Sequence, residues 1–365
     1  MYSFQNDYSE GAHPNILRAL ETINYHQNNS YGLDEHSHAA RELIQEALED
    51  YSVDIHFIAG GTLTNLTFIS HVLRPYEAVI SASTGHINTH ETGAIEATGH
   101  KVFALPSPDG KLTPESIRPV LDLHENEHWV EPRLVYISNP TELGTVYTKE
   151  ELETLYAFCQ RHHLLLYMDG ARLSAALAAH EITHLTFPDL PKLCDAFYIG
   201  GTKSGAMLGE ALVLVQDEFK EHFRFNMKQH GAILAKGWMI GVQFEELFKD
   251  NLYIELGKES IRRMQPMKEA FERAGIPLLC DAPTNQIFPI FPNALAEEIN
   301  KKYLTTFQCR PDARHTCLRF CTSWLTSQEA VNDFVEAFED MVIRYGRTDS
   351  NGESNTPMQA YEASI

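Results

Sequence analysis

Between residues 53 and 215, short apolar runs alternate with longer stretches of helical periodicity. The apolar runs are rich in aliphatic or β-branched residues and are bounded by Gly, Pro, Asn or Asp, a pattern typical of strands. Seven strands are therefore predicted, at Val53–Ile58, Ala78–Ser81, Lys101–Leu105, Leu134–Ser138, Leu164–Met168, Ala196–Ile199 and Ala211–Val215.

The stretches between these runs predict helices, the clearest being Thr62–Leu73, Pro114–Asp122 and Lys149–His162. Strands separated by helices favour a sheet that is mostly parallel and covered by helices on both faces. This part of the chain is therefore predicted to be an α/β domain with a mostly parallel seven-stranded sheet.

The pattern changes after Asp217. Residues 217–249 and 252–274 have helical periodicity, with no sharp break at Ile240–Gly241. A mixture of strands and helices follows, at Gln286–Phe291, Asn293–Lys302, Thr316–Cys321 and Ser327–Tyr345. We expect an N-terminal segment (1–20), a large domain (21–250), a smaller α+β domain (251–345) and a flexible tail (346–365) that is rich in Ser, Asn, Gly and Thr.

The amino-acid composition excludes some classes of binding partner. The chain has 29 Lys and Arg against 50 Asp and Glu, a net charge of −21. Nucleic acids and anionic membranes bind basic patches, so neither is expected as a partner. No apolar run reaches the roughly 18 residues of a membrane span. The six cysteines form no CxxC pair, and the first residues do not resemble a signal peptide, so we expect a cytoplasmic protein with reduced thiols.

A lysine follows the sixth predicted strand, in the segment Tyr198-Ile-Gly-Gly-Thr-Lys-Ser-Gly205. The small neighbours of Lys203 allow a bulky group to approach its amine. A desolvated lysine has a lowered pKa and becomes nucleophilic toward an aldehyde. The alternative is an ordinary lysine in a surface loop.

An aspartate ends the fifth predicted strand, in Leu164-Leu-Leu-Tyr-Met-Asp-Gly-Ala-Arg172. The carboxyl ends of parallel strands are where α/β proteins bind ligands. There, Asp169 could hold a proton on a heteroaromatic nitrogen. The alternative is an Asp that caps the following helix.

Two further segments are weaker on their own. In Ile58-Ala-Gly-Gly-Thr-Leu-Thr-Asn65, a strand leads through Gly60 and Gly61 into a helix, whose N-terminus could bind a phosphate. A simple tight turn explains that pattern equally well. In Thr84-Gly-His-Ile-Asn-Thr-His-Glu-Thr-Gly93, His86 and His90 have the i,i+4 spacing of metal ligands. The HExxH pattern and a third ligand are missing, so no metal is expected, and a histidine stacked on a flat cofactor is the alternative.

The four segments together indicate one cofactor. In chain order they supply a helix N-terminus for a phosphate, an imidazole for a ring face, an Asp for a ring nitrogen and a Lys for an aldehyde. Pyridoxal 5′-phosphate (PLP) is a cofactor that is bound by this set of groups.

The same ordered motifs resemble a known family. Gly60-Gly-Thr62, His86-Ile-x-x-x-Glu91-x-Gly93, Met168-Asp-Gly-Ala-Arg172 and Thr202-Lys-Ser-Gly205 are similar to those of the threonine aldolase/β-eliminating lyase family. The resemblance extends from about residue 5 to about residue 345. It implies the fold of type I PLP enzymes, with a large domain like that of aspartate aminotransferase and a smaller C-terminal domain.

The resemblance assigns roles to the cofactor-binding residues. Lys203 would form the Schiff base, Asp169 would hold the pyridine N–H, and His86 would stack on the ring. Arg172 would reach the ring hydroxyl or the substrate carboxylate. Backbone N–H groups and a hydroxyl would bind the phosphate, at Gly60, Gly61 and Thr62.

The resemblance also implies residues for the substrate and for the subunit interface. Arg319 would clamp the α-carboxylate through its bidentate guanidinium. His128 would be a second active-site histidine. Lys228 stands where the family has an arginine that reaches the phosphate across a subunit interface. A homo-oligomer, dimer or tetramer, with shared active sites is therefore expected.

Three segments depart from the family pattern. Residues 4–9 replace Arg-Ser-Asp-Thr-Val-Thr, residues 202–205 replace Ser-Lys-Gly-Leu, and Asn139-Pro-Thr141 replaces Asn-Thr-His. The resemblance implies that these positions face the substrate, so the departures concern substrate preference more than cofactor use.

The resemblance implies retro-aldol cleavage of L-threonine, L-allo-threonine or a related β-hydroxy-α-amino acid to glycine and an aldehyde. His86 or His128 would take the β-hydroxyl proton, since the pKa of imidazole lies near neutral pH. One alternative is β-elimination from a serine- or cysteine-like amino acid, with Lys203 as the base. Another is a non-catalytic binding protein with the same fold.

Overall fold

The computed structural model describes residues 1–124 and 126–349, with side chains up to residue 344. The chain divides into two compact units. The larger, which we call the sheet unit, contains residues 11–142 and 146–257. The smaller, the C-terminal unit, contains residues 1–10, 143–145 and the chain from Lys258 onward. The domain limits at residues 20 and 250 stay a prediction.

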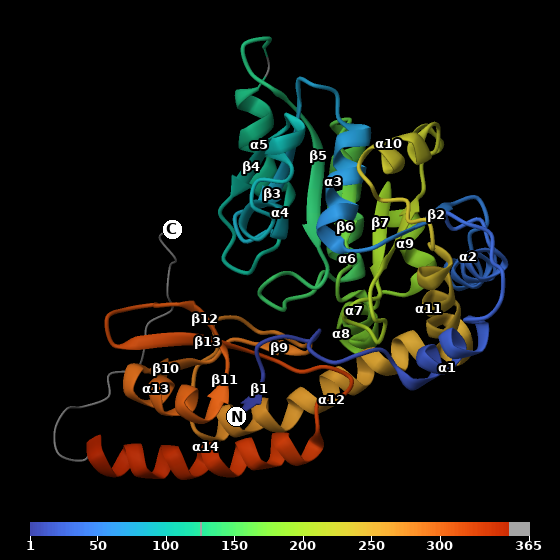
Figure 1. Cartoon of the computed structure of the whole chain (residues 1–365). Coiled ribbons are helices and arrows are strands. Elements are labelled where there is room, and N and C mark those ends of the chain that lie inside the picture. Colours follow the sequence, from blue (N-terminus) through green and yellow to red (C-terminus); the bar gives the residue numbers. More distant parts are fainter. Residues whose placement is uncertain (125, 350–365) are drawn as a thin grey trace. The chain divides into compact units, whose positions relative to one another are not determined.

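The sheet unit is built on seven strands in the order β2-β8-β7-β6-β5-β3-β4 (Figure 1). The strands β3 to β7 pair in parallel, whereas β8 is antiparallel to both of its neighbours. The mostly parallel seven-stranded sheet is therefore confirmed. The strands are β2 (Asp54–Ile58), β3 (Glu77–Ala82), β4 (Lys101–Leu105), β5 (Glu131–Ser138), β6 (Leu165–Asp169), β7 (Ala196–Gly200) and β8 (Glu210–Leu214).

Helices cover the sheet. Every residue of β3, β6, β7 and β8 is buried, which requires cover on both faces. The α-helices of this unit are α1 (Pro14–Ile23), α2 (Glu35–Leu48), α3 (Gly61–Val72), α4 (His86–Thr89), α5 (Pro114–Leu123), α6 (Lys149–Arg161), α7 (Leu173–Ala178), α8 (His180–Thr183), α9 (Leu190–Leu193), α10 (Phe223–Gln229) and α11 (Trp238–Phe248). Of these, α3 and α10 share one apolar core with the strands, through residues such as Phe68 and Phe223.

Local signals fix where several helices begin. At α6, the Thr148 side chain accepts a hydrogen bond from the Glu151 amide, and the Glu151 carboxylate accepts one from the Thr148 amide. This capping box satisfies two amides that the first turn leaves without partners. Thr113 and Ser116 form the same arrangement at α5. The sequence analysis did not identify α2, whose start Asp34 caps by accepting from the Ser37 amide at 2.8 Å.

The C-terminal unit has two small sheets. Strand β13 pairs with β10, β12 and β9 in antiparallel fashion, and β1 pairs with β11 in parallel. Its core is rich in phenylalanine, including Phe4, Phe271 and Phe334. The strands are β1 (Tyr2–Ser3), β9 (Gln286–Ile287), β10 (Ile290–Pro292), β11 (Tyr303–Leu304), β12 (Thr306–Cys309) and β13 (His315–Cys321), and the helices are α13 (Asn293–Lys302) and α14 (Gln328–Asp349). Helix α12 (Leu252–Arg273) begins in the sheet unit and continues into this one.

The helical stretch predicted at residues 217–249 is wrong as a continuous element. The structure has α10 and α11 separated by residues 230–237. Gly231 adopts a positive φ of 74°, and the Ala232 amide donates to the Met227 carbonyl at 2.8 Å. This is the hydrogen-bond pattern by which a glycine ends a helix.

The single strand predicted at Gln286–Phe291 is also wrong, because the structure splits it into β9 and β10. Pro289 lies between them and has no N–H to donate to a ladder. Its carbonyl still accepts from the Leu318 amide at 3.1 Å.

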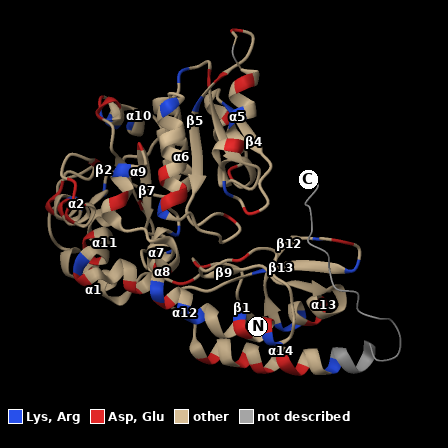
Figure 2. Ribbon diagram, turned by 180° about the vertical axis from the view of Figure 1, so that it is seen from behind, with Lys and Arg blue, Asp and Glu red and all other residues tan. Residues whose placement is uncertain are grey.

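Helix α14 continues to Asp349, beyond the predicted end at residue 345. The rest of the predicted tail, residues 350–365, lies outside the described residues. Acidic residues are spread along the part of α14 that is coloured in Figure 2. No helix within residues 1–124 and 126–349 is both long enough and apolar enough to cross a membrane.

Candidate active site

Four segments of the predicted site follow or end strands at the same edge of the large sheet. Gly60 follows β2, His86 follows β3, and Lys203 follows β7. Asp169 is the last residue of β6 and is paired in register with Ser138, the last residue of β5. This arrangement is the ligand-binding edge of an α/β sheet, as predicted. It depends on β8 being antiparallel, which makes β2 parallel to β7.

Asp169 is surrounded by hydrogen-bond donors. Its side chain is buried, with 3 % of the residue exposed. Oδ2 accepts from the Tyr136 hydroxyl at 2.6 Å and from the Asn65 amide at 3.1 Å. Oδ1 accepts from the Tyr198 hydroxyl and from the Ala171 backbone amide. Four donors on one carboxylate favour its ionised form.

The charge of Asp169 follows from this environment. Burial alone would raise its pKa, but the positive charge of His86 and the hydrogen bonds from Tyr136, Tyr198 and Asn65 outweigh burial, so the pKa of Asp169 is lowered. A carboxylate that remains ionised inside the protein can stabilise a protonated ring nitrogen. This is the property that the predicted role requires.

His86 begins the short helix α4. Its Nδ1 atom lies 2.7 Å from the carboxylate of Glu91, which also accepts from the Asn65 amide at 2.8 Å. Burial lowers the pKa of His86, but the hydrogen bond to Glu91 and the charges of Glu91 and Asp169 raise it above its usual value overall. The side chain is 36 % exposed, so part of the ring is available for stacking.

The N-terminus of α3 lies next to the Asp169 cluster. Gly60 caps the helix without a side-chain bond, so the first amides of α3 can bind an anion. A Cβ atom added to Gly61 would lie 3.0 Å from the Tyr198 hydroxyl, which itself bonds to Asp169. The candidate phosphate site and the candidate ring-nitrogen site are therefore joined through Tyr198. Thr62 is exposed at the start of α3.

Lys203 lies in the loop between β7 and β8 and is half-buried. Its positive charge lowers the pKa of His86 and that of Glu210, so the amine is close enough to influence both groups. Glu210 is buried at the start of β8 and accepts from the Gly201 amide at 2.9 Å and from the Thr202 hydroxyl at 2.8 Å. Burial raises the pKa of Glu210 to about 7, against the opposing effects of Thr202 and Lys203. This carboxyl group holds the loop that carries Lys203.

Sequence analysis missed several of these residues. Tyr136 and Tyr198 are spaced like core residues of apolar strands, and their hydroxyl groups give no pattern of their own. Asn65 and Glu91 lie inside motifs that the sequence analysis singled out, but their contacts with Asp169 and His86 could not be inferred. Glu210 follows a glycine-rich loop, where an acidic residue is usually exposed.

Three further predicted residues belong to the sheet unit. Arg172 is half-buried at the start of α7, three residues after Asp169. Lys228 is exposed on α10, with its Nζ atom 4.8 Å from the centre of the Tyr31 ring. His128 is exposed in the loop before β5, at the edge of the sheet opposite to Asp169. The sheet unit of one chain therefore does not bring His128 to the site, and its role stays a prediction that needs a second copy of the chain.

Arg319 belongs to the C-terminal unit, on β13. Its Nη2 atom donates to the Gln5 carbonyl at 2.9 Å, and its buried Nε has no hydrogen-bond partner in the part of the chain that the structure describes. A guanidinium with an unused donor can bind a carboxylate. Its role in substrate binding stays a prediction.

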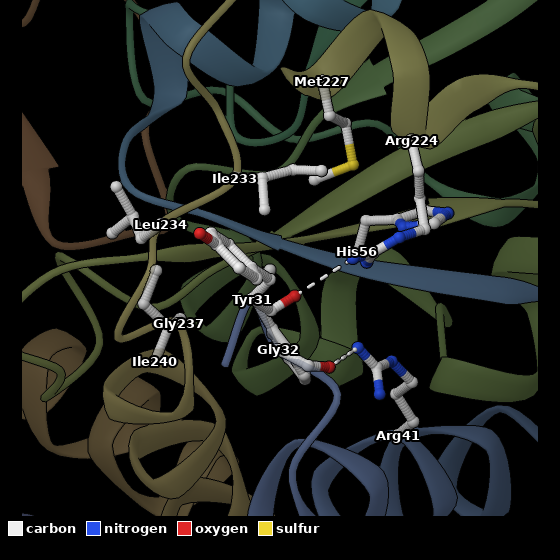
Figure 3. A pocket seen from close by; sticks show the side chains of 11 residues that line it. Tyr31, Gly32, Arg41, His56, Arg224, Met227, Ile233, Leu234, Gly237 and Ile240 are labelled. Carbon is white, nitrogen blue, oxygen red and sulfur yellow. Dashed lines mark hydrogen bonds between the residues drawn. The ribbon is translucent and has the colours of Figure 1, made fainter. Parts of the chain in front are cut away.

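A separate cavity lies between α2, β2 and α10 (Figure 3). Arg41 and Arg224 border it, and each donates to a backbone carbonyl, that of Gly32 and of Tyr31 respectively. Its volume of about 20 Å³ suffices for a water molecule, whereas an amino acid needs far more. It is not a candidate for the substrate site.

The fold and the site together define the class of protein as an α/β enzyme of PLP fold type I. The structure of Thermus thermophilus aspartate aminotransferase superposes with a TM-score of 0.69 over 93 % of this chain and 91 % of that one, at 14 % identity. At this low identity the likeness concerns the fold alone.

The sequence pattern of the beta-eliminating lyase family matches residues 9–294, so the chain belongs to that family. It is similar to the structure of a threonine aldolase from Leishmania major, with 48 % identity, a TM-score of 0.92 and coverage of 94 % of this chain and 100 % of that one. It is also similar to the low specificity L-threonine aldolase of a Pseudomonas species, 29 % identical over 338 residues, which cover 90 % of this chain and 95 % of the relative. The family resemblance inferred from the motifs is confirmed.

Proposed function

We propose that this chain cleaves L-threonine, or a related β-hydroxy-α-amino acid such as L-allo-threonine, to glycine and an aldehyde with the help of PLP. The observation that carries the proposal is the ionised, buried Asp169 next to His86, Lys203 and the N-terminus of α3. The named threonine aldolases that resemble the chain over nearly its whole length support the same reaction.

The residues of the sheet unit fit PLP. Asp169 would hold the protonated ring nitrogen, His86 would cover one ring face, and Lys203 would bind the aldehyde carbon covalently. Backbone amides at Gly60, Gly61 and Thr62, with Arg172 and with Lys228 from a second subunit, would bind the phosphate and the ring hydroxyl. Once bound, PLP supplies a sink for the electrons of the Cα–Cβ bond that breaks.

The chain's own residues would orient the substrate and move its proton. Arg319, with Arg172, would bind the α-carboxylate and hold the amino acid in one orientation. In its neutral form, with Nδ1–H donated to Glu91, His86 has a lone pair on Nε2, which can accept the β-hydroxyl proton directly or through water. His128 from a second subunit is the other candidate for this base.

The family description favours a second candidate function. Beta-eliminating lyases remove a group from Cβ, and here Lys203 would act as the base at Cα. The products distinguish the two reactions, since aldol cleavage of threonine releases acetaldehyde and glycine, whereas elimination from serine releases pyruvate and ammonia. A non-catalytic binding protein with this fold would release neither.

The test is a comparison of products. Purified protein with PLP is given L-threonine, L-allo-threonine or L-serine, and acetaldehyde and pyruvate are each followed with a coupled dehydrogenase. We expect acetaldehyde from the threonine substrates, its loss in Lys203→Ala, and no change in Lys192→Ala, an exposed lysine on α9. Pyruvate from serine without acetaldehyde would move the function to β-elimination. No product with any of the three would overturn the proposal.

We further propose a homo-oligomer, dimer or tetramer, in which Lys228 and His128 reach the site of a neighbouring subunit. The position of His128 supports this, because it lies before β5 at the edge of the sheet opposite to Asp169 and cannot serve the site of its own sheet unit from there. A cytoplasmic location is proposed from the six free cysteines.

A further inference from the structure

Glu142 places a second carboxyl group close to the Asp169 cluster. It follows β5 and keeps part of its surface accessible. Its Oε1 atom accepts from the His86 backbone amide at 2.8 Å and lies 2.7 Å from the Ser138 hydroxyl. Sequence analysis gave Glu142 no role, and the reaction proposed above does not use it.

A row of hydroxyl groups joins Glu142 to Asp169. The Ser138 hydroxyl lies 3.3 Å from the Tyr136 hydroxyl, and the Tyr136 hydroxyl lies 2.6 Å from Asp169 Oδ2. Three contacts therefore connect the two carboxyl groups, all through side chains of β5. Ser138 and Tyr136 are both buried.

The number of hydrogens decides the direction of this row. A hydroxyl has one hydrogen to donate, and an ionised carboxylate can only accept. Tyr136 must donate to Asp169, so Ser138 must donate to Tyr136 if that contact is a hydrogen bond. Ser138 then has no hydrogen left for Glu142. All three contacts can exist together only when Glu142 carries a proton and donates it to Ser138.

When Glu142 ionises, Ser138 has to turn its hydrogen toward the new negative charge. Tyr136 then loses the bond that polarises its hydroxyl toward Asp169, and chains of this kind strengthen each member in turn. Asp169 on β6 and the backbone amide of His86 on α4 face Glu142, and the charge of Glu91 also acts on Tyr136. Burial and the charge of Asp169 raise the pKa of Glu142, and the bonds from Ser138 and from backbone amides oppose this.

We propose that Glu142 is a positioning residue that stores a proton and, through Ser138 and Tyr136, controls how strongly Asp169 is held as the acceptor for the ring nitrogen. The inference rests on the proposed function only in that Asp169 binds that nitrogen. No covalent bond changes except the O–H bond of Glu142, whose proton is exchanged with water. The ring-nitrogen site thereby responds to the pH of the solvent.

The first test needs no cofactor. The infrared spectrum of the apo-protein shows the carbonyl stretch of each protonated carboxylic acid. The difference between wild type and Glu142→Gln is expected to contain one such band, which disappears as the pH rises. The matched control, Glu77→Gln, removes a buried carboxyl group at the opposite edge of the sheet and is expected to leave that band in place. Absence of that band from the difference between wild type and Glu142→Gln at a pH where exposed carboxylates are ionised would overturn the proposal.

The second test follows the absorbance of bound PLP against pH. In Glu142→Gln the amide can donate to Ser138 permanently, so one titration step seen in wild type is expected to vanish, with the acid-side spectrum retained. Ser138→Ala breaks the row at another point and is expected to remove the same step. In a Tyr136→Phe background, Glu142→Gln is expected to have no further effect.

The outcomes separate the two proposals. If the absorbance of bound PLP titrates in Glu142→Gln and in Ser138→Ala as it does in wild type, the proposed role of Glu142 is overturned, even if PLP binds and threonine is cleaved. Failure of wild type to show any absorbance from lysine-bound PLP would instead overturn the proposed function. The infrared test does not depend on the proposed function, because it is carried out without PLP.

Discussion

The carboxylate of Glu91 lies 2.7 Å from the Nδ1 atom of His86. Glu91 is buried, and its carboxylate also accepts from the Asn65 amide, which donates to Asp169 as well. One amide therefore ties together the two acidic groups that act on His86. The charge and orientation of the imidazole depend on both.

Glu91→Gln is expected to lower the pKa of His86, because the hydrogen bond and charge of Glu91 both raise it. The measurement is an NMR titration of protein labelled with nitrogen-15 in its histidines. Glu96→Gln, at an exposed glutamate that begins a short 3-10 helix five residues further on, serves as the control. An unchanged His86 titration in Glu91→Gln would contradict the account of this pair.

Asp169→Asn is expected to reduce threonine cleavage by about 10²-fold or more, the scale of a lost proton-holding group. The neutral amide cannot stabilise a protonated ring nitrogen, and its NH₂ group faces donors rather than acceptors. Activity is measured alongside urea unfolding, with the exposed Asp54→Asn as control. Near-normal activity in a folded Asp169→Asn protein would show that the ring nitrogen lies elsewhere.

Sequence analysis found the residues whose position depends only on a strand end. Lys203, Asp169 and His86 each follow or end a strand of the parallel set, and the shared edge of the sheet brings them together. It did not find Glu142 or Glu210, because burial of a glutamate depends on what packs over it in the fold. The contacts of Tyr136 and Tyr198 were hidden for the opposite reason, since a tyrosine in an apolar strand is predicted as core whether or not its hydroxyl is used.

The secondary structure was also predicted only in part. The strands of the large sheet were predicted to within a few residues because their apolar runs are bounded by turn residues. The break at Pro289 and the helix end at Gly231 were missed, because apolar periodicity continues across both. Pro289 has no N–H group for a strand ladder, and Gly231 has a positive φ that ends the helix. Each of these local features interrupts an element that the apolar pattern predicts as continuous.

Gly61→Ala is expected to weaken PLP binding about tenfold. The added Cβ would lie 3.0 Å from the Tyr198 hydroxyl, so either α3 or Tyr198 must move, and such crowding costs about 1–3 kcal/mol. Gly60→Ala is the matched variant, since its Cβ would meet no atom within 4 Å and its φ of −177° suits any residue. Fluorescence titration measures the affinity of both variants for PLP. Equal losses of affinity in Gly61→Ala and Gly60→Ala would contradict the predicted crowding against Tyr198.

His56 makes the sheet unit sensitive to acid. Burial, followed by the charges of Arg41 and Arg224, lowers its pKa from 6.5 to about 3, so the folded protein keeps it neutral where the unfolded chain protonates it. Stability from this residue is fully present above pH 6.5 and is lost as the pH falls toward 3, by at most about 1.4 kcal/mol per pH unit.

His56→Leu is therefore expected to flatten the decline of the urea midpoint between neutral and mildly acidic pH. His38→Leu, at a histidine whose side chain is 72 % exposed, should leave that decline as in wild type. A decline in His56→Leu as steep as in wild type would contradict the burial of a neutral imidazole.

The most direct test of the proposed PLP site is to locate the lysine that binds PLP. The PLP-loaded protein is reduced with borohydride, digested and analysed by peptide mass spectrometry. We expect a single pyridoxyl phosphate label, on Lys203. A label on another lysine with Lys203 unmodified, or no label on a protein that cleaves threonine, would contradict it.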